Sequence, residues 1–273
     1  MASSTATRPS SPRPFLALIF GVTIGVLGGL IGLGGAEFRL PILIAFFAIA
    51  VHQAVRFNLL VSLITLLAAV IARFGFAAFP DLPANGEVIL ALALGATAAA
   101  WAGANMLQRV GAGPLLRIIA ALLFGIALLL GFEIWAGEAF VLLRIDGAAA
   151  RPFAAIAIGI GIGLVSSLLG VAGGELIIPT LTYVFGFDIR SAGTASLLIS
   201  IPAVTVGVIR HFRNGAYGDR AVITALVAPM GAGSVIGAML GALILPHIDG
   251  TTIKALLAVI LVVSAVKLAR KSH

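Results

Sequence analysis

The chain has 273 residues, of which 61% are hydrophobic and only 10% are charged, and its mean hydropathy is +1.19. A soluble domain carries roughly 25% charged residues, so the composition leaves no room for a separate soluble domain and makes lipid the expected solvent. The net charge of +7 comes from basic residues scattered at the ends of apolar segments, which is typical of loops beside membrane spans and not of a nucleic-acid-binding face.

A short polar tail comes first in the chain. Residues 1–13 are rich in Ser, Thr and Pro, and the apolar stretch after them has no clear small-residue cleavage site. We therefore expect an uncleaved tail followed by a first membrane segment, not a signal peptide.

Apolar segments then follow one another almost without pause. A membrane-spanning helix needs about 20 apolar residues, so the two shortest segments, 38–51 and 176–187, suit half-helices or re-entrant segments. The polar stretch 133–151 is the expected linker between a first repeat, 14–132, and a second repeat, 152–270. The expected segments are 14–33, 38–51, 57–73, 87–109 and 114–132 in the first half, and 152–171, 176–187, 195–211, 221–245 and 252–269 in the second.

The sequence indicates that the two halves arose by duplication. They align without a gap when the chain is displaced by 138 residues, the separation between Gly32 and Gly170. Apolar composition alone does not readily produce matched Gly, Glu, Pro and Asp residues in register. The matched pairs include Gly21 and Gly159, Glu37 and Glu175, Pro41 and Pro179, Ser62 and Ser200, and Gly103 and Gly241.

The expected fold class is an all-α integral membrane protein of two homologous repeats, with roughly 8–10 membrane segments that include short broken or re-entrant helices. Whether the short segments cross the bilayer decides whether the repeats are inverted or parallel. We favour the inverted arrangement by analogy with other transporters, whose substrate sites lie near midplane between the repeats.

Each half contains one Gly-rich motif between apolar segments, which predicts a broken helix. Such a break exposes backbone polar groups, and these are tolerated in a membrane only where protein or a wet cavity satisfies them. The helix that restarts after each break presents free N–H groups and a positive dipole end, so the two breaks together could hold an anion. We expect Gly32, Pro41, Gly170 and Pro179 to shape the breaks, and Gly34, Gly35, Ala36, Ala172, Gly173 and Gly174 to form the substrate region.

Three charged residues follow the glycines directly. Glu37 and Glu175 stand in the first turn after each break, where a carboxylate either caps the helix or couples transport to a proton. An ionised Glu at this position would repel an anion, so coupling requires the protonated form or a carboxylate turned away. Arg39 has Ile177 at its matched position, and three roles stay open for it: pairing with Glu37, contacting the substrate, or lying at the interface.

Polar residues after the short segments form a second set of candidates. Asn58 and Ser196 are matched and stand at expected helix starts, where they either cap the helix or donate to a substrate oxyanion, and Thr194 lies beside Ser196. Arg73 and His211 are also matched. They either anchor the interface or serve in gating or proton relay, and His211 is the third proton-coupling candidate.

No motif of a soluble enzyme is present. The sequence has no Walker P-loop, no G-x-S-x-G elbow and no Rossmann fingerprint, and it has no Cys. We therefore expect a protein that is not an enzyme, with no cofactor and no metal site, and we do not expect ATP-driven transport by this chain alone.

The motif G-x-G-G-x-E-x-x-x-P, present once per half, resembles the TauE/SafE family of sulfite exporters. The resemblance extends to Thr194-Ala195-Ser196, to His211 with Asn214-Gly215, and to the Gly-rich stretch 231–241. The family pattern has three consecutive glycines, and this chain has Ala36 in place of the third in one copy and Ala172 in place of the first in the other.

The resemblance implies a multi-pass transporter of the bacterial inner membrane that exports sulfite, a sulfonate or a related organosulfur anion. Alternating access with proton coupling is the expected mechanism, and an anion channel or an uptake carrier for another small organic anion is the alternative. An intramembrane enzyme would need a cluster of acid–base or metal-binding residues, and only the two Glu residues suggest one. The expected partners are the anion, protons and the lipid bilayer, without nucleic acid, and a homodimer is one option for the oligomeric state.

Overall fold

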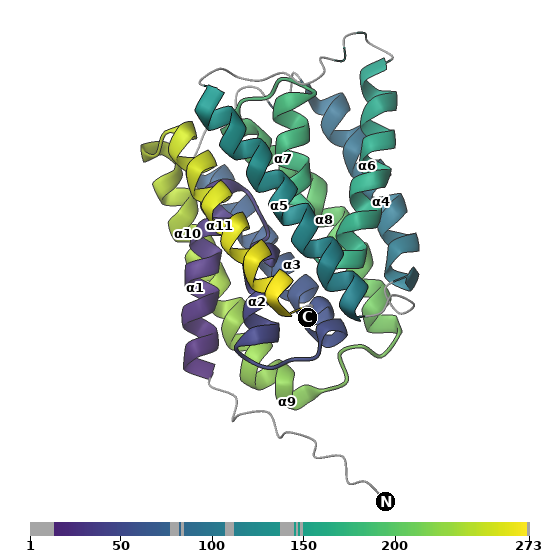
Figure 1. Cartoon of the computed structure of the whole chain (residues 1–273), viewed down its shortest axis with the longest axis vertical. Helices are drawn as coiled ribbons and strands as arrows, with labels where there is room; N and C mark the ends of the chain where they lie inside the picture. The colour runs from purple at the N-terminus through teal and green to yellow at the C-terminus, as the bar shows by residue number, and fades with distance from the viewer. Residues whose placement is uncertain are drawn as a thin grey trace, which may run out of the picture.

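Every regular element that the computed structural model describes is helical (Figure 1). The structure describes residues 14–76, 82, 85–106, 112–136, 145, 147 and 150–271. Its elements are α1 (Pro14–Ile31), α2 (Ala36–Ala45), α3 (Val51–Phe76), α4 (Gly86–Met106), α5 (Ala112–Ala136), α6 (Ala150–Leu169), α7 (Gly174–Tyr183), α8 (Ile189–Arg213), α9 (Arg220–Val222), the π-helical η3 (Ile223–Val227), α10 (Ala228–Ile244), the 3₁₀-helical η4 (Leu245–His247) and α11 (Gly250–Lys271).

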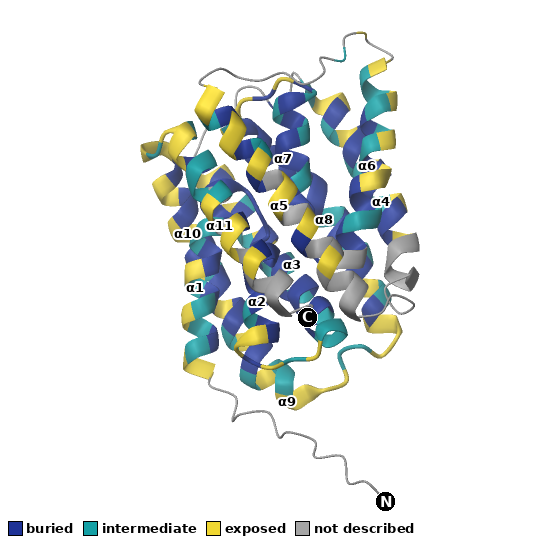
Figure 2. Ribbon diagram, viewed as in Figure 1, coloured by how far each residue is buried: buried dark blue, intermediate teal, exposed yellow. Residues whose placement is uncertain are grey.

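The length and composition of the helices are those of a membrane protein. Among the described residues, five stretches are long and apolar enough to cross a bilayer: Pro14–Ile31, Val51–Gly75, Ala150–Ser167, Ile189–Arg213 and Arg220–His247. Shorter apolar stretches lie in α4, α5 and α11. The outward faces carry large apolar side chains, whereas the short helices α2 and α7 are almost wholly buried inside the bundle (Figure 2). The chain is therefore a membrane protein with several apolar helices.

Small residues bring the long helices into backbone contact. Helix α1 packs along α10, and α6 packs along α4. A Cβ added to Gly237 of α10 would lie 2.1 Å from the carbonyl oxygen of Val22 in α1, and one added to Gly163 of α6 would lie 2.2 Å from that of Ala96 in α4. Glycine is required at such positions because any side chain would push the helices apart. Helices α3 and α8 also contact each other, and α5 packs along α11.

Two long helices start earlier than the sequence predicts. Helix α3 begins at Val51 and α8 at Ile189, so Asn58 and Ser196 lie well inside these helices and do not cap them. The capping alternative for these two residues is therefore wrong. The N-cap of α8 is Asp188, whose carboxylate accepts hydrogen bonds from the backbone N–H groups of Arg190 and Ser191.

The expected tail, 1–13, lies outside the described residues, as does most of the expected linker, 133–151. Helix α5 extends into the linker range as far as Ala136, and α6 begins within it at Ala150.

The α4–α6 contact can be tested with two glycines that are two residues apart on α6 and therefore lie on different faces of the helix. A Cβ at Gly159 would lie 2.6 Å from the carbonyl oxygen of Leu92, whereas no atom lies within 4 Å of a Cβ at Gly161. We expect Gly159→Leu to lower the free energy of unfolding by about 1–3 kcal/mol or more, because the two backbones must separate. Gly161→Leu should leave it unchanged or slightly higher, because glycine is a poor helix former. Melting temperatures in detergent measure the difference, and equal losses in the two variants would contradict the packing.

Candidate functional site

Two helix breaks lie at the Gly-rich motifs, as the sequence predicts. Gly35 has φ +69° and directly precedes α2, and Gly173 has φ +83° and directly precedes α7. This left-handed backbone conformation is readily available only to glycine. Each break turns the chain from a long helix, α1 or α6, into a helix of 10 residues inside the bundle.

Pro41 and Pro179 do not form the breaks, so that part of the prediction is wrong. Both prolines lie inside the short helices α2 and α7. Proline lacks an N–H group and removes one helical hydrogen bond. The short helices tolerate this loss near their middle, and the change of direction occurs at the glycines.

The two breaks press against each other at the centre of the bundle. A Cβ on Gly34 would lie 2.8 Å from the Cβ of Ala172, and one on Gly174 would lie 2.6 Å from a side-chain carbon of Leu33. A Cβ on Gly32 would lie 2.2 Å from the carbonyl oxygen of Gly193 in α8. Residues from both halves therefore form one continuous region with little free space between the two motifs.

Glu37 and Glu175 meet in this region. Their relative exposures are 1% and 0%, and the carboxyl group of Glu175 lies against that of Glu37, where a shared proton can join them. Among the described residues, none of the four carboxyl oxygens has a hydrogen-bond partner. Two buried carboxylates in contact cannot both ionise without strong repulsion. The geometry therefore favours a pair that holds a proton, and the helix-capping alternative finds no support in a hydrogen bond.

Arg39 is fully buried and lies among neutral acceptors from two helices and from the first break. Its guanidinium group donates to the side-chain oxygens of Ser62 at 3.0 Å and Thr65 at 3.1 Å on α3, and to the hydroxyl of Ser234 at 3.4 Å on α10. It also donates to the carbonyl oxygen of Gly34 at 3.2 Å in the break. Glu37 is near enough to attract it electrostatically, although the two residues form no ion pair in the described structure.

Asn58 ties the two breaks together. Its side-chain amide donates to the carbonyl oxygens of Ala36 and Gly170, each at 3.0 Å, and its side-chain oxygen accepts from Arg39 at 3.3 Å. Asn58 is thus a structural link between the motifs of the two halves. Sequence reasoning missed the hydroxyl groups of Ser62, Thr65 and Ser234, although the match of Ser62 with Ser200 was a signal for the first of them.

Arg73 and Thr194 form a second polar link, at the end of α1. The guanidinium group of Arg73 donates to the carbonyl oxygens of Gly29 at 2.9 Å and Leu30 at 3.0 Å, and to the hydroxyl of Thr194 at 2.6 Å. Because α1 stops at the break, its last carbonyl groups have no helical partner, and Arg73 supplies one. Thr194 is therefore engaged by Arg73 in this structure.

His211, the matched position of Arg73, has no such partners. It is 1% exposed, and neither ring nitrogen has a hydrogen-bond partner in the described chain. Its charged neighbours are Arg56 and Arg210, and neither Glu37 nor Glu175 is among them. Beside it, the hydroxyl of Tyr217 donates to the carbonyl oxygen of Arg56 at 3.2 Å, and burial raises the pKa of Tyr217 above its ordinary value, which keeps that donor protonated.

A pocket opens next to the second break. It has an empty volume of about 240 Å³ and reaches Ser166 and Ala172 from the side of α4, α6 and α8. The buried hydroxyl groups of Ser166 and Ser196 lie at this break. Neither of them, nor the buried hydroxyl of Ser200 one turn along α8, has a hydrogen-bond partner among the described residues. These hydroxyl groups therefore differ from those of Ser62 and Thr65 near the first break, which accept hydrogen bonds from Arg39.

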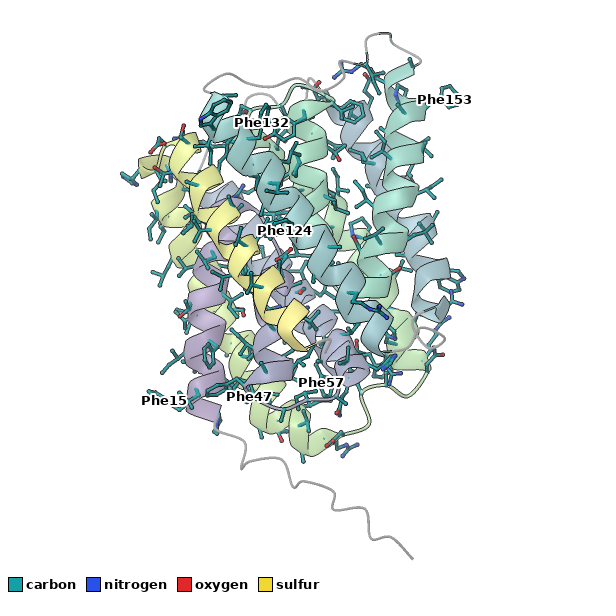
Figure 3. All side chains as sticks on the ribbon, viewed as in Figure 1. Phe15, Phe47, Phe57, Phe124, Phe132 and Phe153 are labelled. Carbon is teal, nitrogen blue, oxygen red and sulfur yellow. The ribbon has the colours of Figure 1, made fainter. Side chains whose placement is uncertain are left out.

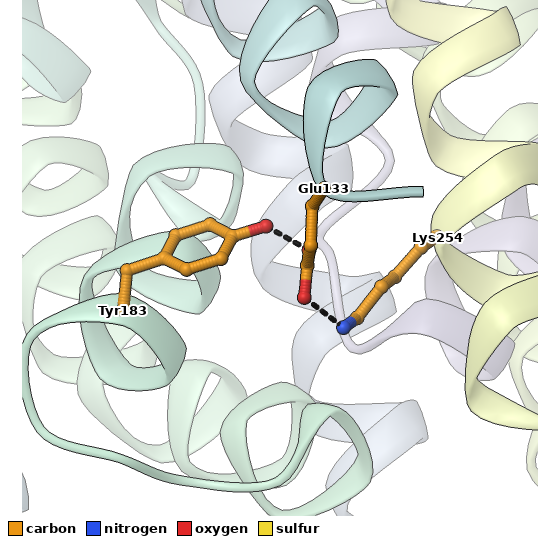
Figure 4. Close-up of polar contacts among 3 residues, drawn as sticks. All are labelled: Glu133, Tyr183 and Lys254. Carbon is orange, nitrogen blue, oxygen red and sulfur yellow. Dashed lines mark hydrogen bonds and ion pairs between the residues drawn. The ribbon is translucent and has the colours of Figure 1, made fainter. Parts of the chain in front are cut away.

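A further polar contact joins the second short helix to the outer helices. Tyr183 at the end of α7 donates to one oxygen of Glu133 in α5, and Lys254 of α11 forms an ion pair with the other oxygen (Figure 4). Glu133 is 5% exposed. Removing either partner would leave a buried carboxylate poorly compensated, so this contact fixes α7 to the α5–α11 pair.

The family model described as sulfite exporter TauE/SafE matches residues 2–130 and 155–273. The chain belongs to the TauE/SafE family. The matched residues include both helix breaks and the buried polar residues around them, so this polar core is part of the family domain.

One curated relative of this TauE/SafE protein is a probable membrane transporter protein of Methanocaldococcus jannaschii. It is 26% identical over 123 residues, which cover 43% of this chain and 45% of the relative. The match thus spans less than half of the relative's length. No solved structure matches the chain.

The role of Arg39 in this TauE/SafE protein can be tested by removing its charge. We expect Arg39→Leu to lower the free energy of unfolding by roughly 3–5 kcal/mol, because buried acceptors lose their donor and buried carboxyl groups lose a nearby positive charge. Arg213→Leu is the control, since Arg213 is exposed at the end of α8. Melting temperatures in detergent compare the two, and an equally small loss in both would show that the Arg39 contacts do not support the fold.

Proposed function

We propose that this chain is a secondary transporter that exports small sulfur-containing anions, such as sulfite or a small sulfonate, by alternating access. The observation that carries the proposal is the contact between Glu37 and Glu175 at the crossing of two broken helices. The family description supports the substrate class. We propose the inner, cytoplasmic membrane as its location.

We propose further that the two halves are inverted repeats that move relative to each other. Phe15 and Phe153, which are 138 residues apart, are 72% and 73% exposed, and they lie at opposite ends of the molecule (Figure 3). Each stands in the first turn of its helix, so α1 and α6 start at opposite ends. The packing supports the same relation. Helix α1 matches α6 and α4 matches α10, and α1 of the first half packs on α10 of the second, just as α6 of the second half packs on α4 of the first.

The chemistry of the centre favours an anion. The N-termini of α2 and α7 begin at the two breaks, and their dipoles attract negative charge. If Glu37 and Glu175 share one proton, the fully buried Arg39 and Arg73 leave the core with one net positive charge. A monoanion neutralises that charge, which lowers the cost of burying it in a low-dielectric interior.

The same charge balance supports proton coupling. Loss of the anion from the core would favour loss of the shared proton, since the two arginines would then be balanced by two carboxylates. Anion binding and proton binding therefore assist each other, and by thermodynamic reciprocity each raises the affinity for the other. The tight contact between Gly34 and Ala172 fits a carrier that must rearrange better than a permanently open channel.

The test is sulfite flux in proteoliposomes with and without a pH gradient. We expect wild-type flux to respond to the gradient, and Glu37→Gln combined with Glu175→Gln to abolish that response, because amide groups cannot carry the proton. Thr205→Val is a control on α8, where the Thr205 hydroxyl donates only to its own helix at Ile201.

The outcomes separate the alternatives. Wild-type sulfite flux that ignores the gradient would favour the channel. Gradient-driven flux that survives in the double Gln variant would leave a transporter but remove the carboxyl pair from the coupling. Folded wild-type protein that carries neither sulfite nor a small sulfonate would contradict the proposed substrate class.

A further inference from the structure

We infer that the two halves are not equivalent and that this protein has one anion site, at the second break, formed by the hydroxyl groups of Ser166, Ser196 and Ser200. The inference rests on the proposed function, because it assigns the substrate of that function to one half. It concerns an oxyanion with several acceptor oxygens, such as sulfite or an alkylsulfonate.

In the first half, the position next to the break is already filled. The guanidinium group of Arg39 occupies it and bonds to Gly34, Ser62 and Thr65. Ser62 and Thr65 also donate to backbone carbonyl oxygens one turn earlier, at 2.7 and 2.8 Å. The hydroxyl groups of Ser62 and Thr65 near the first break are therefore satisfied by the protein itself, and a built-in cation lies where a ligand would have to bind.

In the second half, the residues at the matched positions do not supply an arginine or its partners. Ile177 stands at the position that matches Arg39, Ala203 at that of Thr65, and Ser196 at that of Asn58. Ser200 keeps the hydroxyl that matches Ser62, and Ser166 adds a hydroxyl where the first half has Gly28. The second half therefore lacks the internal cation and its amide link, and it retains hydroxyl donors.

These hydroxyl groups are buried around the break without partners. The side-chain oxygen of Ser166 is 2.4 Å from where a Cβ on Gly173 would lie, and that of Ser196 is 3.0 Å from where one on Gly174 would lie. Ser200 is one helical turn from Ser196 on α8. The exposures of Ser166, Ser196 and Ser200 are 8%, 0% and 1%, and no described residue bonds to any of their hydroxyl groups. Buried hydroxyl groups normally have hydrogen-bond partners, so the lack of protein partners here points to a ligand.

A pocket reaches one of the three hydroxyl-bearing residues, Ser166. The pocket of about 240 Å³ reaches Ser166, Val171 and Ala172, and Ala203 and Val204 of α8, one turn beyond Ser200, also line it. The N-terminus of α7 and the carboxyl group of Glu175 lie directly after the break, which puts the proposed proton beside the proposed anion.

The test compares matched hydroxyl groups in the two halves by the KM for sulfite and for methanesulfonate in proteoliposomes. We expect Ser196→Ala and Ser200→Ala to raise KM roughly 10-fold or more each, because each removes a hydrogen bond to a charged ligand. Ser62→Ala should mainly lower the melting temperature, because Arg39 loses a hydrogen-bond acceptor. It should raise KM less than Ser200→Ala does. Thr205→Val should leave KM unchanged, since its hydroxyl is satisfied within α8.

The controls keep two failures apart. Wild-type protein without anion flux would contradict the proposed function. Normal wild-type flux with unchanged KM in Ser196→Ala and Ser200→Ala would overturn this inference alone, as would equal effects of Ser62→Ala and Ser200→Ala on KM. The Ser196 and Ser200 variants should also melt near the wild-type temperature. That result would show that raised KM values are not a consequence of misfolding.

Discussion

Four ionisable side chains are buried where the two broken helices cross, and the rest of the structure serves to make that burial possible. Arg39, Arg73, Glu37 and Glu175 are each at most 1% exposed. Isolated charges in a low-dielectric interior cost several kcal/mol each, so they persist only where donors, acceptors and opposite charges compensate them. The arginines meet this condition through hydrogen bonds to hydroxyl and carbonyl oxygens, whereas the two carboxyl groups have mainly each other.

The glycines explain how the backbone reaches this arrangement. Breaking a helix in a membrane exposes carbonyl groups that lipid cannot satisfy. Here Arg73 bonds to the last carbonyls of α1, and Asn58 bonds to carbonyls of both breaks. The close contacts of α1 with α10 and of α6 with α4 hold the frame around these breaks, and they require residues without side chains at the crossing points.

Much of this arrangement could be predicted from the sequence, because helix length, glycine position and repeat register are local signals. The breaks before Ala36 and Gly174 lie where the glycines predict them. The sequence predicts the starts of α3 and α8 too late, since residues His52 to Arg56 and Ile189 to Ser191 read as loops but belong to helices. Contacts between distant segments, such as Arg39 with Ser234 and Arg73 with Thr194, depend on tertiary packing and have no local signal. The difference between the halves was visible at Arg39 and Ile177, but its meaning needed the hydroxyl groups around each break.

The central claim is that the anion and a proton share the core through the Glu37–Glu175 pair. The most direct measurement is the affinity of purified protein for methanesulfonate as a function of pH, in wild type and in the Glu37→Gln, Glu175→Gln double variant. Arg39 is the cation near Glu37, and an arginine stays protonated across the neutral and acidic pH range of this titration. We predict that wild-type affinity rises as pH falls and that the double variant loses this dependence. Affinity that does not change with pH in the wild type, or an equal dependence in the double variant, would contradict the claim.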